Sequence, residues 1–318
     1  MRRVLALIMM LSLGGCETLT IAMTKKIEPQ ADEADVGILQ VVATPGTENP
    51  LWGTGGSDLK THCTTGDQKL FEAIWVPIVV NLAIKAGGAA ASKYVKGVKE
   101  DSSKSTKFRA FVNSQTLKSA SCLIAYRGPE VLMNGQVAPK DREPNALVVM
   151  TVERYGKAMR LVPVYAYARN SISLTKCTGK CGDAKIAEGK INIAVAVTAV
   201  AAVPNQLGDI KLQELGTATV TVKKVPLRDE VKKRTKVKVN TAEGVEDEEI
   251  VTPVGAPSDI IALPIDDVGV QLTVVMSEIG DAAGDPDVAE AEIQAAVESL
   301  SVGAEAELKA HYEREAED

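Results

Sequence analysis

The stretch INIAVAVTAVAAV, residues 191–203, begins with an apolar side chain at every second position. Two later stretches share this period: GTATVTVKKV, residues 216–225, and VGVQLTVVM, residues 268–276. In the first of these two, threonine alternates with alanine or valine. Alternation with a period of two is typical of β-strands that have one buried face and one solvated face. These stretches therefore predict a sheet whose strands are mostly antiparallel.

Two more strands precede them. Residues 147–152 and 159–167 are rich in β-branched and aliphatic side chains, and the turn sequence Tyr155-Gly156-Lys157 lies between them. This arrangement predicts an antiparallel hairpin. Five strands without intervening helical patterns favour an antiparallel β-sandwich over residues 145–280.

The preceding region, residues 36–144, is expected to be an α+β region. Short strands are predicted at 36–43, 108–112 and 121–126, and a helix kinked at Pro77 is predicted over 67–99. Residues 73–91 approach the length of a membrane span, so a membrane-inserted helix and a core helix lying against the sheet are both considered. Placing Lys85 or Asn81 in lipid would be costly, which favours the core helix.

Residues 227–250 form a charged insert that changes sign along its length. Cationic residues come first and acidic residues follow. The insert is interpreted as a solvated hairpin whose two arms pair opposite charges, or as an electrostatic docking arm for another subunit. Its candidate partner-binding residues are Arg228, Lys232, Lys233, Arg234, Glu246 and Asp247.

Residues 285–318 are expected to form a C-terminal amphipathic helix. Gly284-Asp285-Pro286 supplies a typical helix start, and the residues that follow are mostly glutamate and alanine. A narrow apolar stripe is predicted to dock on the domain or to pair with a partner helix. Its candidate contact residues are Ile293, Val297 and Leu300, and Ala304 and Leu308 continue the stripe.

The chain begins with Met1-Arg2-Arg3, an apolar run over residues 4–13, and the sequence Leu13-Gly14-Gly15-Cys16. A basic start, a short apolar segment and small residues before a cut describe a secretory signal. The final four residues resemble the lipobox of bacterial lipoproteins. That resemblance implies that residues 1–15 are removed and that Cys16 is acylated. Residues 17–35 are polar, so residues 16–35 are expected to form a lipidated tether. Glu17, in place of the aspartate that commonly retains such proteins in the inner membrane, implies the outer membrane of a Gram-negative bacterium.

Four other cysteines fit an oxidising compartment: Cys63, Cys122, Cys177 and Cys181. Of the three pairings that four cysteines allow, Cys63–Cys122 and Cys177–Cys181 are favoured. The alternative is a metal site that uses His62, Cys63, Cys177 and Cys181. Adjacent His62 and Cys63 suit tetrahedral ligation poorly, so no metal site and no cofactor are expected.

The amino-acid composition argues against several classes of function. The 318 residues have a net charge of −6 and only 3% aromatic side chains, which argues against a nucleic-acid binder. Two histidines and the absence of catalytic sequence motifs argue against an enzyme. We expect a structural or interaction component of a cell-envelope assembly, with protein partners or self-association. The alternatives are a module that captures a peptide or glycan, for example at an edge strand over 216–225, and a hydrolase with an unrecognised site.

Overall fold

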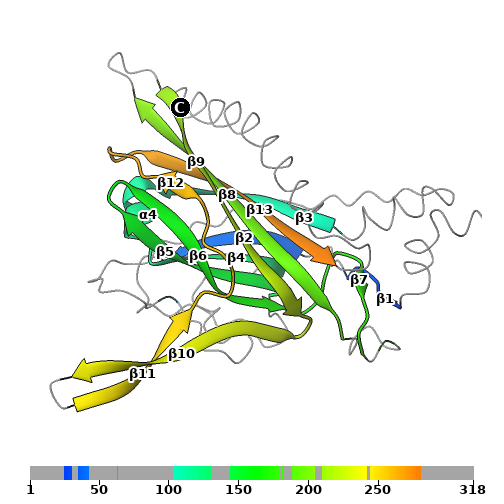
Figure 1. The fold of residues 1–318 in the computed structure, drawn as a ribbon. Helices are drawn as coiled ribbons and strands as arrows, with labels where there is room; N and C mark the ends of the chain where they lie inside the picture. The colour runs from blue at the N-terminus through cyan, green and yellow to red at the C-terminus, as the bar shows by residue number, and fades with distance from the viewer. Residues whose placement is uncertain are drawn as a thin grey trace, which may run out of the picture.

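The computed structural model describes residues 25–30, 35–42, 63, 103–129, 144–179, 181, 188–204, 210–241 and 244–280. These residues are mostly antiparallel β-sheet (Figure 1). The strands are β1 (Lys26–Ile27), β2 (Asp35–Val42), β3 (Ser103–Asn113), β4 (Cys122–Pro129), β5 (Ala146–Tyr155), β6 (Ala158–Ala168), β7 (Thr175–Lys176), β8 (Lys190–Pro204), β9 (Ile210–Pro226), β10 (Asp229–Thr241), β11 (Gly244–Thr252), β12 (Ile260–Ala262) and β13 (Gly269–Gly280).

The larger sheet has seven strands. Its order is β11-β10-β6-β5-β4-β2, and β12 pairs with β6 beside this path. The predicted hairpin over 147–167 is confirmed as β5 and β6, with Gly156 at a φ of 61° in the turn. A positive φ is adopted readily by glycine, so the turn residue explains the tight connection.

Strands β1 and β7 form a separate two-stranded sheet, and the smaller of the two main sheets has four strands in the order β3-β13-β8-β9. It contains all three alternating stretches that point to a sheet, now seen as β8, β9 and β13. Strand β13 lies between β3 and β8 and pairs with both over most of its length. The antiparallel strands predicted from the period-two patterns are therefore confirmed. The solvated face that the same patterns predicted is wrong for β8 and β13, because the residues on both faces of these two strands are buried over most of their length.

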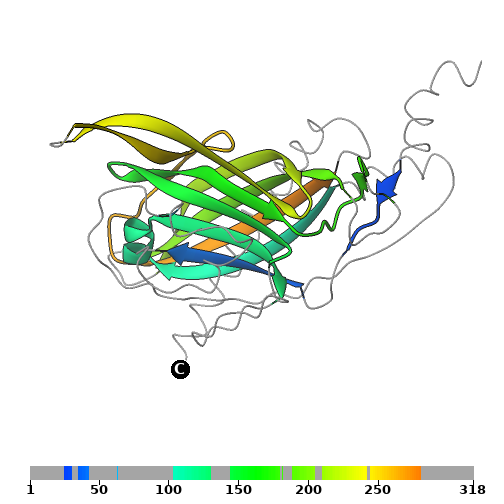
Figure 2. The ribbon, with the colours of Figure 1, turned by 90° about the horizontal axis from the view of Figure 1, so that it is seen from below.

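Side chains from both sheets meet in one continuous apolar cluster. It includes Leu123 and Val148 from the larger sheet and Val197, Val220 and Leu272 from the smaller one. Figures 1 and 2 show the backbones of the two sheets that contribute these side chains lying close to each other. The alternation of small and branched apolar residues along each strand thus supplies the interior of the molecule.

The larger sheet has a second apolar face on the side away from this cluster. A separate cluster lies there, in which Ile124 and Tyr165 are fully buried. Cys63, bonded to Cys122, belongs to the same cluster. Both faces of the larger sheet are therefore apolar and buried, which explains why β4 and β5 read as nearly continuous apolar runs.

The boundary expected between residues 144 and 145 falls between β4 and β5, which are neighbours in one sheet. Strands β2 and β4 pair with each other and β3 pairs with β13, so strands from both sides of residue 144 share the same sheets. The short helix α4 (Ser114–Ser119), capped by the side chain of Asn113, was not anticipated. The predicted helices over 67–99 and 285–318 lie outside the described residues. Within the described part of the chain, no helix is both long and apolar enough to span a membrane.

Candidate functional site

Both favoured disulfides are confirmed. The Cα atoms of Cys63 and Cys122 are 5.4 Å apart, and those of Cys177 and Cys181 are 5.8 Å apart. All four sulfur atoms are used in these bonds, so the alternative that makes three of them zinc thiolates does not describe this structure. Among the described residues, no group of three or more metal-binding side chains was found.

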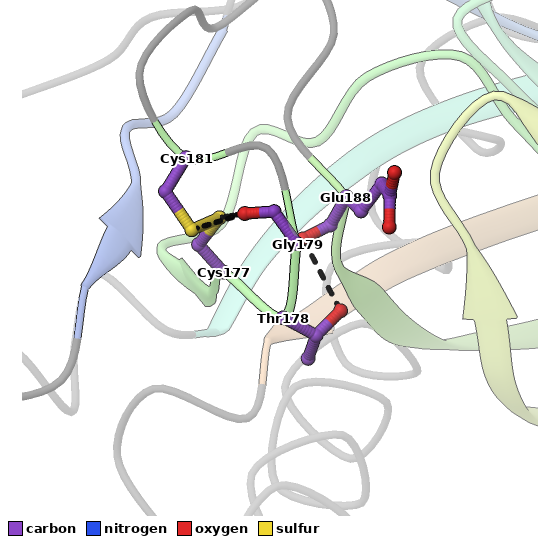
Figure 3. The surroundings of a disulfide bond; sticks show 5 residues. All are labelled: Cys177, Thr178, Gly179, Cys181 and Glu188. Carbon is purple, nitrogen blue, oxygen red and sulfur yellow. Dashed lines mark hydrogen bonds between the residues drawn. A yellow bond between two sulfur atoms is a disulfide. The ribbon is translucent and has the colours of Figure 1, made fainter.

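The small disulfide loop lies beside the start of the described chain (Figure 3). The backbone N–H of Thr178 donates to the carbonyl oxygen of Glu188 at 2.8 Å, and its hydroxyl donates to the same oxygen at 3.3 Å. The carbonyl oxygen of Gly179 lies 3.0 Å from the sulfur of Cys177. Disulfide sulfurs carry no hydrogen, so this is a packing contact. The loop is thus fixed between β7 and β8 and has the role of a structural crosslink.

The charged insert is confirmed as a hairpin, formed by β10 and β11. Strand β10 pairs with β6 only from Asp229 to Lys232, and from Lys233 onward its partner is β11. We call residues 233–252 the charged hairpin. Figures 1 and 2 show it extending beyond the rest of the two sheets.

The register of the charged hairpin places opposite charges across from each other. Lys236 is the Cα partner of Glu249, and Lys238 is the Cα partner of Asp247. Opposite charges at paired positions stabilise an antiparallel pair by roughly 0.2–1 kcal/mol each. The pairing of one cationic arm with one acidic arm, as expected from the sequence, is therefore present in the backbone register.

The candidate contact residues occupy different parts of this element. Arg228 is half-buried in the turn before β10, and Lys232 forms an ion pair with Glu230 of its own strand. Lys233 and Arg234 are exposed at the point where β10 leaves β6. Glu246 and Asp247 lie on β11 opposite Val239 and Lys238. The other candidates, Cys16, Ile293, Val297 and Leu300, lie outside the described residues.

A buried ionic cluster between the two sheets was missed by the sequence interpretation. The guanidinium of Arg127 on β4 donates from Nε to Oε1 of Glu278 on β13 at 2.6 Å, and it also forms an ion pair with Asp35 on β2. All three side chains are almost completely buried. Arg127 and Asp35 belong to one sheet and Glu278 to the other, so the cluster connects the two sheets at one end of the interior.

Neutral groups complete the cluster. Nδ2 of Asn145 donates to Asp35 at 2.6 Å, and the backbone N–H of Ile172 donates to Glu278 at 3.0 Å. Burial alone would lower the pKa of Arg127, but the charges and hydrogen bonds of Glu278 and Asp35 outweigh it and raise that pKa above its ordinary value. The arginine therefore stays charged. A charged cluster with this many partners suits a structural connection between the sheets.

The edge proposed for peptide capture is covered. Strand β9 ends the four-stranded sheet, but the backbone of Gly255 packs against the carbonyl oxygen of Thr221. A Cβ atom at Gly216 would lie 3.4 Å from the carbonyl oxygen of Ile260. The chain from 254 to 262 therefore lies along this side of β9, where an added peptide strand would need to pair.

Comparisons with protein-family models, with curated proteins and with solved structures found no match to this chain. Its function has to be inferred from its own residues and geometry.

Proposed function

We propose that this chain is a lipid-anchored outer-membrane lipoprotein that acts as an interaction component of a cell-envelope assembly, and that the charged hairpin contacts its partner. The observation that carries the proposal is the hairpin itself. It no longer pairs with β6 after Lys232, and the described side chains at 233–236 and 238 are exposed. A projecting hairpin with one arm of cationic sequence and one arm of acidic sequence suits electrostatic recognition of another protein.

The tether expected over residues 16–35 is shorter than that, because β1 and the buried Asp35 of β2 already belong to the fold. The point where the shorter tether meets the fold supports the proposed role. The described chain starts at Lys25, whose carbonyl oxygen accepts a hydrogen bond from the N–H of Cys177 at 2.8 Å. Cys16 precedes Lys25 by 25 − 16 = 9 residues, which span at most about 30 Å when extended. A lipid on Cys16 would keep the end with β1 and β7 near the membrane. Figures 1 and 2 show the charged hairpin at the opposite end.

We also infer that the two sheets form a β-sandwich, because side chains from both contribute to one apolar cluster. This body would act as the rigid support between the lipid anchor and the hairpin. The ionic cluster of Arg127, Asp35 and Glu278 links strands of both sheets and adds to that rigidity.

An exchange of charges tests the hairpin. The test variant exchanges the charges of two cross-strand pairs, by Lys236→Glu/Glu249→Lys and by Lys238→Asp/Asp247→Lys. It keeps the net charge and the cross-strand pairing but inverts the charge pattern that a partner would meet. We expect it to fold like the native chain and to lose most of the proteins that co-purify with the native chain after gentle detergent extraction. Quantitative mass spectrometry of the purified material gives the comparison.

A matched control exchanges a partly exposed cross-strand ion pair, Arg160→Glu/Glu153→Arg, on β5 and β6. This control should retain the co-purifying proteins. Retention of those proteins by the exchanged hairpin as well would show that the hairpin only pairs with itself, and the proposal would then be wrong.

A further inference from the structure

The four-stranded sheet has a second face that points away from the interior. Because Leu272, Val274 and Met276 of β13 face the interior, the residues between them face outward. We call this surface the outer face. It comprises Gln271, Thr273, Val275 and Ser277 on β13 and Ala194, Ala196, Thr198 and Val200 on β8.

The outer face is buried. Val275 is 3% exposed, Thr273 2% and Ser277 0%, and the facing residues of β8 are equally inaccessible. Neighbouring strands shield a side chain from the sides only, so values this low need a layer above the sheet. The small apolar clusters on this face contain only residues of the sheet's own strands. Within the described residues, no other element supplies the layer.

A buried amide oxygen on the outer face also indicates that a hydrogen-bond donor lies above the sheet. Gln271 is 1% exposed, and its Oε1 accepts no hydrogen bond from any described residue. An unpaired buried amide oxygen costs about 1–3 kcal/mol, so a donor is expected above it. The rest of the face is made of alanine, serine, threonine and valine, which lets a helix approach closely.

We propose that the C-terminal segment of the same chain, residues 285–308, packs on the outer face with the stripe of Ile293, Val297 and Leu300 turned toward the sheet. The chain leaves β13 at Gly280, so this segment follows directly from the central strand of the face it covers. A helix over 287–308 is about 33 Å long. The 12 residues of β13 extend about 40 Å, so the helix can return along nearly the whole strand.

Charge agrees with this placement. The segment after Gly284 has eleven acidic residues and two basic ones: Asp285, Asp287, Glu290, Glu292, Glu298, Glu305, Glu307, Glu313, Glu315, Glu317 and Asp318, against Lys309 and Arg314. On β3, at the rim of the outer face, Lys107 is paired with Val275 and Arg109 with Thr273. A cationic rim beside an apolar strip suits an acidic helix with one apolar stripe. The inference does not depend on the lipid anchor or on the charged hairpin.

Thiol labelling of the full-length chain tests the cover. A thiol introduced by Val275→Cys should react slowly with a maleimide, compared with an exposed reference thiol introduced by Lys236→Cys. Combining Val275→Cys with Ile293→Asp/Val297→Asp/Leu300→Asp should speed its labelling by about tenfold or more. The control Ala291→Asp/Ala295→Asp/Ala306→Asp adds the same charge on the opposite side of the helix and should leave labelling slow.

Equal labelling of Val275→Cys with and without the stripe substitutions would overturn the proposal, because another segment would then cover the face. A thiol at Val197→Cys, in the interior between the sheets, reports general unfolding and should stay unlabelled in all variants.

A second measurement does not depend on stability. Each stripe position, changed to cysteine together with Val275→Cys, should give an intramolecular product with a short bifunctional maleimide. Ala295→Cys with Val275→Cys should give none. Cross-linking only between two chains would assign the face to a second copy, and no cross-linking would exclude the segment, so both results contradict the proposal.

Discussion

Arg127 shows how a single side chain connects two sheets. Its Nε bonds Glu278 on β13, while another nitrogen of the same guanidinium pairs with Asp35 on β2. A planar guanidinium offers several donors in fixed directions, which a lysine ammonium at the end of a flexible stem does not. We therefore interpret the cluster as a connection that depends on arginine and on both carboxylates.

Removing the arginine leaves two carboxylates buried without their partner. We expect Arg127→Met to lower the free energy of unfolding by about 3–5 kcal/mol, as measured by urea denaturation. The triple variant Asp35→Asn/Arg127→Met/Glu278→Gln removes all three charges and should recover much of this loss. If Arg127→Met were as stable as the native chain, the ion pairs would contribute nothing to stability.

Two glycines with positive φ differ in how strictly they need glycine. Gly216 has a φ of 121° on β9, whereas Gly156 has a φ of 61° in a turn with open space around it. We expect Gly216→Asn to cost about 1–3 kcal/mol of unfolding free energy and Gly156→Asn to be nearly neutral. Thermal and urea unfolding of the two variants give the comparison, and equal losses would contradict it.

At the scale of single elements, local patterns predicted the strands well. β8, β9 and β13 each alternate with a period of two, and the turn at Gly156 joins β5 to β6 as expected. The charged hairpin also followed from its sequence, because its arms carry opposite charges. Each of these features depends on residues close together in the chain, which is why the sequence was sufficient.

Long-range relations could not be predicted in the same way. The pairing of β3 with β13 joins residues more than 150 positions apart, and no local pattern indicates it. The ionic cluster also depends on contacts between residues far apart in the chain, although one of its residues carries a sequence signal. Glu278 continues the apolar series Leu272, Val274, Met276 in phase, so its place in the sequence could have indicated a charge on a buried face, but this was not predicted. Its partners depend on the pairing of distant strands.

The two disulfides close loops of very different length, so they should differ in their effect on stability. Cys63 and Cys122 are separated by 59 positions, and Cys177 and Cys181 by 4. Loop-closure entropy predicts losses of about 4 kcal/mol for Cys63→Ser/Cys122→Ser and about 2 kcal/mol for Cys177→Ser/Cys181→Ser. Urea unfolding of each double variant measures the two losses, and the reverse order would contradict the prediction.

At the scale of the whole molecule, the proposed function needs three parts along one axis: the lipid tether, the two sheets and the charged hairpin. Strands β1 and β7 lie at one end of the described structure, the two larger sheets form the middle, and the charged hairpin lies at the other end (Figure 1). This arrangement would present the hairpin at a fixed distance from the membrane. A lipid anchor is well suited to that purpose because it leaves the folded part in water.

The anchor itself is tested by Cys16→Ala. We expect this variant to leave the membrane fraction after washing with salt and carbonate, because burial of acyl chains supplies about 0.8 kcal/mol for each methylene group. The native chain should remain with the membranes. If the variant stays bound as firmly as the native chain, the lipobox interpretation is wrong.

The most direct test of an assembly component is its size in its native surroundings. Native membranes are extracted with a gentle detergent, and the particle that contains this chain is sized and its composition determined by mass spectrometry. We predict a particle of defined composition, larger than the 33.6 kDa chain, with other envelope proteins in fixed ratio. A lone chain of monomeric mass would contradict the proposed function.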